Sequence, residues 1–142
     1  MLKEINVMLD NGAFLPTRAH EDDAGLDIYS PVKECVWRGE SVTIDTGVHV
    51  QIPKGYVGML KSKSGLNCKH GIIGEGVIDS GYSGSIVCKL YNFNTDSRNY
   101  HIEKGDKIIQ LVIVPIETPA VNVVYDLWDS DRGSNGFGST GR

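Results

Sequence analysis

The segment VTIDTGVHVQI, residues 42–52, carries apolar side chains at every second position on both sides of a short break. This alternation is the period of a β-strand with one buried face, and Thr46-Gly47 reads as the turn that interrupts it. Many short strands separated by turn residues predict an all-β sandwich, barrel or jelly roll. Similar runs, bounded by Gly, Asn and Asp, occur at Ile5–Leu9, Tyr56–Leu60, Ile86–Asn92, Ile108–Val114 and Val121–Tyr125.

At most one short helix is expected in this chain. It follows Ser64 through Leu66-Asn67-Cys68-Lys69, and Gly71 is expected to end it. From residue 129 the sequence DSDRGSNGFGSTGR offers little to bury except Phe137, so it predicts a flexible arm. The expected organisation is therefore one β-domain over residues 1–128 and a C-terminal arm over residues 129–142.

The composition excludes some classes of function. A chain of 142 residues suits one domain, and its 18 acidic and 14 basic side chains give a net charge of −4. Direct nucleic-acid binding is not expected, because it needs a basic face. The N-terminus lacks the apolar region of a signal peptide, and no apolar run is long enough to cross a membrane. Together with three widely spaced cysteines, these features predict a cytoplasmic protein without membrane contact.

Three segments contain groups that suit phosphate chemistry, although each also has a purely structural interpretation. Residues 62–66 offer hydroxyls, a lysine and backbone N–H groups at a helix start, but an ordinary capped turn looks the same. Asp79 lies at the tip of an expected hairpin, where a carboxylate is either a turn former or a catalytic base. Residues 132–140 offer an arginine and a donor-rich backbone, or a disordered tail.

Five segments, taken in order, resemble the five motifs of the trimeric dUTPase family. The resemblance covers most of the chain and implies a distorted jelly roll or β-barrel that assembles as a homotrimer with shared active sites. It also implies hydrolysis of dUTP to dUMP and pyrophosphate with Mg²⁺, which limits uracil in DNA and supplies dUMP for dTMP synthesis. The five segments are AGLDIYS (24–30), KSGL (63–66), GVIDSGYSG (76–84), GDKIIQL (105–111) and RGSNGFGSTG (132–141).

The resemblance implies a role for each matching residue. Asp79 would activate the water that attacks the α-phosphorus, as a general base. Tyr82 would pack on the deoxyribose and exclude a 2′-hydroxyl, and Phe137 would cover the uracil ring as part of a lid. Main-chain groups around Gly76 and Val87 would read the uracil. The remaining substrate contacts would come from Lys63, Ser64, Gly65, Gln110, Arg132, Gly138 and Ser139.

Mg²⁺ is expected to be held by the substrate phosphates, because the sequence shows no cluster of metal ligands of its own. Asp27 would support the ion only through water, and a structural role for this carboxylate is equally open. Five positions depart from the family pattern, the first being Ser62 in place of the usual proline. Lys63 replaces the usual arginine, Gly81 an acidic residue, Ser83 an arginine or glutamine, and Asn135 a glycine. Lysine lacks the two-pronged donor of arginine, so substrate affinity and the role of Lys63 are affected.

Two other functions remain open. A dCTP deaminase has the same fold, but the third motif offers no second acid/base group for deamination. A nucleotide-binding regulatory protein would keep the site and act through a protein partner, as in a phage-encoded relative. The four histidines are dispersed and show no metal-ligand spacing, so structural or solvent-exposed roles are expected for them.

Overall fold

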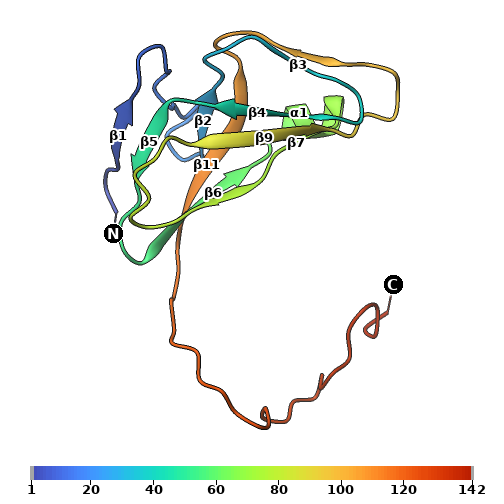
Figure 1. Cartoon of the computed structure of the whole chain (residues 1–142). Helices are drawn as coiled ribbons and strands as arrows, with labels where there is room; N and C mark the ends of the chain where they lie inside the picture. The colour runs from blue at the N-terminus through green and yellow to red at the C-terminus, as the bar shows by residue number, and fades with distance from the viewer. Residues whose placement is uncertain (1, 142) are drawn as a thin grey trace.

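The computed structural model describes residues 2–141, which form a β-rich body and an extended C-terminal segment (Figure 1). One short helix is present, as the sequence predicts, and no helix among the described residues is long and apolar enough to cross a membrane. The strands are β1 (Asn6–Leu9), β2 (Gly25–Tyr29), β3 (Glu34–Val36), β4 (Ser41–Asp45), β5 (Val48–Gln51), β6 (Tyr56–Lys61), β7 (Ile72–Ile73), β8 (Gly76–Ile78), β9 (Val87–Asn92), β10 (Tyr100–Ile102) and β11 (Lys107–Pro115).

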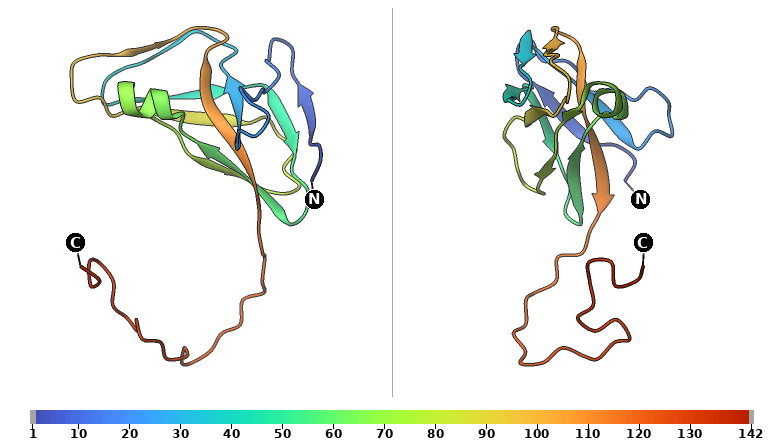
Figure 2. Two further views of the ribbon diagram at one scale, coloured as in Figure 1. Left: turned by 180° about the vertical axis from the view of Figure 1, so that it is seen from behind. Right: turned by 90° about the vertical axis from the view of Figure 1, so that its right-hand side faces the viewer.

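The strands form four antiparallel sheets that share one apolar core. The larger sheets have the orders β2-β11-β6-β8 and β4-β9-β7, and the two-stranded sheets pair β1 with β5 and β10 with β3. Figure 2 shows these sheets packed as one body, with the helix at one end. Inward-facing side chains from both larger sheets fill the core, among them Ile28, Ile44, Leu60, Ile72, Leu90, Ile109 and Leu111.

Residues 42–52 form most of β4 and all of β5, as the sequence predicts. The two strands do not pair with each other, because β4 pairs with β9 and β5 with β1. Gly47 has the left-handed φ of 66° that the sharp corner between them requires. The fully buried Thr46 donates its hydroxyl to the Ile86 carbonyl at 2.7 Å, which fixes the corner to the start of β9.

A β-bulge in β11 changes which side chains face inward. The pairing with β2 passes from Lys107 opposite Tyr29 directly to Ile109 opposite Ile28, so Ile108 is the extra residue. Ile108 and Ile109 are consequently both buried although they are neighbours in sequence. Because of the bulge, Lys107 does not continue the inward-facing alternation of β11. Its side chain can instead pair with a residue on β2.

Helix α1 (Ser64–His70) forms where the sequence predicts it. Gly71 ends it in the left-handed conformation, with φ 63°, and its N–H donates to the Asn67 carbonyl at 3.0 Å. None of the helical side chains is fully buried. The helix is thus a short surface connection between β6 and β7.

The prediction of a strand at Val121–Tyr125 is wrong for the single chain. Directly after β11, the Ile116 N–H donates a hydrogen bond to the Gly55 carbonyl at 2.9 Å. The residues that follow, 117–141, are exposed (Figure 1). The alternating apolar pattern is present at 121–125, but this segment lies beside no strand that could pair with it. The exposed segment shows no structural change at residue 128, so the boundary of the arm at residue 129 stays a prediction.

Candidate active site

The strands on either side of the Asp79 turn belong to different sheets. β8 pairs with β6, whereas β9 pairs with β4 and, only at Tyr91 and Asn92, with β7. The expected hairpin is therefore open, and a pocket of about 220 Å³ lies at its mouth. This one pocket contains three of the predicted site residues, Asp79, Tyr82 and Val87. Its lining is Val77, Ile78, Asp79, Tyr82, Ser85 and Val87.

Tyr82 folds back over the segment that connects the two strands. Its phenol donates to the Ser85 carbonyl at 2.9 Å, and its N–H donates to the Asp79 carbonyl at 3.2 Å. Gly84 leaves the space for this arrangement, because a Cβ there would lie 2.3 Å from the Tyr82 oxygen. Tyr82 remains 46% exposed and Asp79 is exposed as well, so both residues can meet a ligand.

The connecting segment is anchored at its far end to the corner between β4 and β5. The Ser85 hydroxyl hydrogen-bonds the Asp45 carboxylate, and the Ile86 N–H donates to the Val48 carbonyl at 2.8 Å. The bond from Ser85, together with one from the Gly47 N–H, holds the pKa of the Asp45 carboxyl below its ordinary value. The pocket wall thus rests on the strand corner that residues 42–52 encode.

A second group of predicted residues surrounds Asp27 on β2. This aspartate is 5% exposed, and its two carboxylate oxygens pair with the ammonium groups of Lys63 and Lys107, the latter at 2.9 Å. Burial alone would raise the pKa of the Asp27 carboxyl, but the hydrogen bonds and charges of both lysines outweigh it and lower that pKa. The same hydrogen bond to Asp27 raises the pKa of Lys107.

Gln110 lies beside this ion-paired group. It stands opposite Asp27 in the register of β11 with β2, and its side-chain amide donates to the Ser62 carbonyl at 3.0 Å. A Cβ at Gly25 would lie 2.1 Å from the Gln110 side-chain oxygen. Gly25 in the first motif therefore leaves room for the glutamine of the fourth.

The other predicted contacts lie elsewhere in the chain. Ser64 and Gly65 are exposed at the start of α1, and the preceding Lys63 has extended backbone and directs its side chain to Asp27 instead of capping the helix. Gly76 begins β8. The residues of the arm, Arg132, Phe137, Gly138 and Ser139, are exposed and are not brought to the pocket in the single chain (Figure 1).

Within the arm the bonds are local. The Arg132 guanidinium donates to the Asn135 carbonyl at 3.0 Å, and Phe137 is a non-glycine residue with a left-handed φ of 48°. Phe137 is fully exposed, so the chain in this form offers its ring no partner.

Sequence reasoning missed Lys107 and Ser85. Lys107 stands within the quoted fourth motif, but its partner Asp27 is distant in sequence and only the bulge in β11 reveals the pairing. Ser85 follows the third motif and gave no sign of its bond to Asp45. Among residues 2–141, no three His, Cys, Asp or Glu side chains gather into a group that could hold a metal ion.

Comparison with known proteins gives a consistent relationship. Residues 11–141 match the sequence profile of the dUTPase family. The chain is 40% identical over 136 residues to the deoxyuridine 5′-triphosphate nucleotidohydrolase of Clostridium acetobutylicum, an alignment that covers 94% of this chain and 92% of that protein.

Solved structures agree with the sequence comparison. The dUTPase of Staphylococcus bacteriophage 80alpha, solved with dUPNHPP, gives a TM-score of 0.90 at 36% identity and covers 99% of this chain and 100% of its own. A mutant dUTPase of the S. aureus phage phi11, described with a structural Mg(II) ion, gives 0.81 at 33% identity, with coverages of 89% and 100%. The fold expected from the resemblance is confirmed, and the chain belongs to the dUTPase family, whose members hydrolyse deoxyuridine 5′-triphosphate.

Proposed function

We propose that this chain hydrolyses dUTP to dUMP and pyrophosphate at the mouth of the open hairpin between β8 and β9, with Asp79 as the general base. The observation that carries the proposal is the sharing of one pocket by Asp79, Tyr82 and Val87. The family resemblance assigns these residues to water activation, sugar packing and base reading, and the pocket has room for all three roles side by side.

In the reaction, the oxygen of a water molecule attacks the α-phosphorus and pyrophosphate leaves from the opposite side. The Asp79 carboxylate accepts the proton that the water loses, which an exposed carboxylate within hydrogen-bond reach can do. Protein groups contribute mainly by positioning the phosphates and stabilising their charge in such transfers. Asp79 is therefore the one side chain to which a proton transfer is assigned.

Base and sugar selection follow from the shape of the open hairpin. Val87 lines the pocket and Gly76 begins β8, the strand that leads into it, and main-chain groups near these two residues would read the acceptor–donor–acceptor edge of uracil. Cytosine reverses part of this pattern and would leave buried groups unpaired, which can discriminate by roughly 10⁴ or more. Tyr82, held by its bond to the Ser85 carbonyl, would pack on the deoxyribose and leave no room for a 2′-hydroxyl.

The group around Asp27 supplies positive charge for the phosphates. Lys63 and Lys107 together carry one more positive charge than Asp27 neutralises, and both ammonium groups keep donors free for oxygen ligands. Ser64 and the Gly65 N–H at the exposed start of α1, and the Gln110 amide, would provide further phosphate contacts.

The described residues do not by themselves fit a protein-held Mg²⁺ ion. They contain no three-ligand cluster, and both oxygens of Asp27 face lysine ammonium groups. A Mg²⁺ ion would therefore come with the substrate, on its phosphate oxygens, where it neutralises charge. Asp27 would contact it only through water.

The complete site is proposed to need three subunits. Phe137 is fully exposed and the arm leads away from the pocket of its own chain. An arm over residues 129–142 would instead close over a neighbouring pocket, with Phe137 on the uracil and Arg132, Gly138 and Ser139 on the phosphates. The proposed location is the cytoplasm, where the free thiols of all three cysteines would remain reduced.

Pyrophosphate release from dUTP, dCTP, dTTP and UTP with Mg²⁺ tests the reaction. Turnover of dUTP alone is expected, and Asp79→Asn should lower kcat by about 10²- to 10⁴-fold because the amide cannot accept the proton. Asp22→Asn, at an exposed loop position, is the matched control and should leave the rate unchanged. Turnover of dCTP in place of dUTP would contradict the assignment of the uracil pocket.

Subunit complementation tests the shared site. Asp79→Asn chains and chains truncated after residue 128 should each be inactive alone. Co-refolded in equal amounts, they should recover about a quarter of the wild-type activity per site. In randomly assembled trimers about half of the pockets keep Asp79, and about half of those have a neighbouring chain with an intact arm. If each chain completed its own site, the mixture would stay inactive.

The regulatory function stays a separate prediction. If the wild-type chain bound dUTP tightly without hydrolysing it, action through a protein partner would replace hydrolysis as the preferred function.

A further inference from the structure

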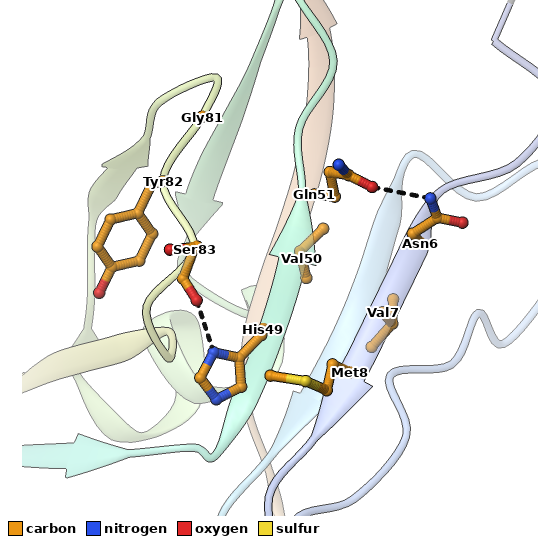
Figure 3. A pocket seen from close by; sticks show the side chains of 9 residues that line it. All are labelled: Asn6, Val7, Met8, His49, Val50, Gln51, Gly81, Tyr82 and Ser83. Carbon is orange, nitrogen blue, oxygen red and sulfur yellow. Dashed lines mark hydrogen bonds between the residues drawn. The ribbon is translucent and has the colours of Figure 1, made fainter.

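His49 on β5 touches the segment that forms the pocket wall, but from the side opposite the pocket. Its Nδ1 lies 2.8 Å from the Ser83 carbonyl oxygen, and its Nε2 lies 3.0 Å from Oδ1 of Asp10. Figure 3 draws a second hollow, lined by His49 and distinct from the Asp79 pocket, and shows the contact with Ser83 and the Tyr82 ring on the other side of the same segment. The ring of His49 is largely shielded, with 18% of its side chain exposed.

Both partners of His49 are hydrogen-bond acceptors. A backbone carbonyl and an ionised carboxylate have no proton to give, so each contact requires an N–H on the histidine. Only the doubly protonated ring carries an N–H on both nitrogens. The geometry therefore corresponds to a positively charged imidazolium that joins β5, the Asp10 turn and the pocket segment.

Loss of one proton breaks one of the two contacts. The neutral ring keeps a single N–H, and a bond to a carboxylate is stronger than a bond to a neutral carbonyl. The proton therefore stays on Nε2 with Asp10, and the lone pair on Nδ1 then faces the lone pairs of the Ser83 carbonyl. Deprotonation thus removes the contact of His49 with Ser83, while the anchors at Ser85 and Ile86 stay in place.

Ser83 is a sensitive place for such a contact because it adjoins Tyr82 near the tip of the segment. The other anchors to the strand corner attach at Ser85 and Ile86, where β9 is about to begin. The Ser83 contact therefore holds the backbone next to Tyr82, whereas the phenol oxygen at the far end of the ring is bonded to the Ser85 carbonyl.

We propose that His49 is a positioning residue that holds the Tyr82 side of the nucleotide pocket in place through the Ser83 carbonyl and releases it on deprotonation. This inference rests on the proposed function for its consequence, since the pocket is assigned to the nucleotide. His49 itself touches no reacting atom.

The charged groups around His49 favour its protonated form. Asp10 faces it from the turn after β1 and Asp45 from the end of β4, while Tyr82 of the pocket segment lines the same hollow. The hydrogen bond to the Ser83 carbonyl, followed by that to Asp10, outweighs burial and raises the pKa of His49 above its ordinary value of 6.5. The contact is thus complete below pH 6.5 and is lost as the pH rises through the raised pKa.

Two substitutions separate the two contacts. In His49→Asn the amide nitrogen takes the place of Nδ1, so it can donate to Ser83 but neither titrates nor reaches Asp10. In His49→Gln the amide nitrogen takes the place of Nε2, so it can reach Asp10 and leaves Ser83 without a donor. His101→Gln, at an exposed position on β10, is the control.

The dissociation constant of dUpNHpp and the KM and kcat for dUTP are measured from about pH 5.5 to about pH 8.5, the range in which histidine loses its proton. Comparison with His49→Asn at each pH cancels the titration of the nucleotide itself. The wild-type Kd and KM should rise about three- to tenfold more than those of His49→Asn, as expected for one lost hydrogen bond, with kcat little changed. His49→Gln should bind weakly at every pH.

Equal pH dependence of wild type and His49→Asn would overturn the inference, as would wild-type affinity in His49→Gln. A parallel fall in kcat and thermal stability without a change in KM would mean that His49 is merely structural. Hydrogen exchange of the Tyr82–Gly84 amides without nucleotide gives a second measurement. Exchange should quicken with rising pH more in wild type than in His49→Asn. This measurement tests the contact between His49 and Ser83 even if the wild-type protein fails to bind or hydrolyse dUTP.

Discussion

The ammonium group of Lys107 lies 2.9 Å from Oδ2 of Asp27, an aspartate whose other carboxylate oxygen pairs with Lys63. This ion-paired group joins three of the five motif segments, which are far apart in the chain. The bulge in β11 makes the pairing with Lys107 possible, and burial of Asp27 makes it costly to disrupt. The motifs therefore stabilise the fold as well as presenting groups to the substrate.

Asp27→Asn should destabilise the protein. The amide leaves two ammonium groups without their counterion, so the free energy of unfolding should fall by about 1–3 kcal/mol, less than for a fully buried pair because both lysines are partly exposed. Urea unfolding measures the change. Asp96→Asn removes the carboxylate of the exposed Asp96–Arg98 pair and should cost far less, because water screens an exposed ion pair. Equal effects of both substitutions would contradict a structural role for Asp27.

The contribution of Asp27 should disappear in acid. Because its pKa is lower in the folded chain than the ordinary value of 3.8, its stabilisation is complete above pH 3.8 and is lost as the pH falls through the folded value. The difference in unfolding free energy between wild type and Asp27→Asn should therefore be constant near neutral pH and shrink below pH 3.8. Urea unfolding at a series of pH values measures it, and a constant difference down to the acid limit would count against the ion pairs.

Local sequence patterns were sufficient to predict most elements. The alternation in residues 42–52 gave β4 and β5, and Gly71 ends α1 where a left-handed glycine was expected. The same reasoning failed at Val121–Tyr125, because alternation identifies a strand with one apolar face but does not supply a partner strand. The segment has the right side chains and no neighbouring strand in the single chain.

Contacts between distant segments could not be predicted in this way. The sequence indicated a hairpin around Asp79, but only the sheet pairing shows that β8 and β9 separate to leave a pocket. His49 was expected to have a structural or solvent role, and its contact with Ser83 spans 34 positions. The family resemblance placed Asp79, Tyr82 and Val87 in one site, whereas nothing in the residues pointed to Ser85 or Lys107.

Gly65→Ala should separate stability from substrate binding. Gly65 lies within α1 and a Cβ there would meet nothing within 4 Å, so alanine should stabilise the helix by about 0.5–1 kcal/mol. The same methyl group would obstruct the approach of phosphate to the backbone, and KM for dUTP should rise. Asn67→Ala, at an exposed position of the same helix, should stabilise the protein without raising KM. Unchanged KM in Gly65→Ala would remove Gly65 from the proposed phosphate contacts.

Two of the three cysteines, Cys68 and Cys88, should react very differently with a thiol reagent. Cys68 is exposed on α1 and should be modified rapidly in the native protein, whereas burial raises the pKa of the Cys88 thiol to about 12 and keeps it from the reagent. Cys68→Ser should abolish the rapid phase of absorbance change with Ellman's reagent. Cys88 should react only when the protein unfolds, and rapid native labelling of Cys88 would show that the core around β9 opens.

Phe137→Ala should weaken substrate binding without affecting the stability of the free protein. The ring is fully exposed in the single chain, so its removal takes no packing from the core and Tm without nucleotide should stay the same. With dUTP, loss of a stacked ring should raise KM about three- to tenfold. Phe137→Tyr keeps an aromatic face and should retain most of the affinity, whereas Phe137→Leu keeps only apolar bulk and should resemble alanine. If leucine served as well as tyrosine, the ring would act by covering the pocket and not by stacking on the base.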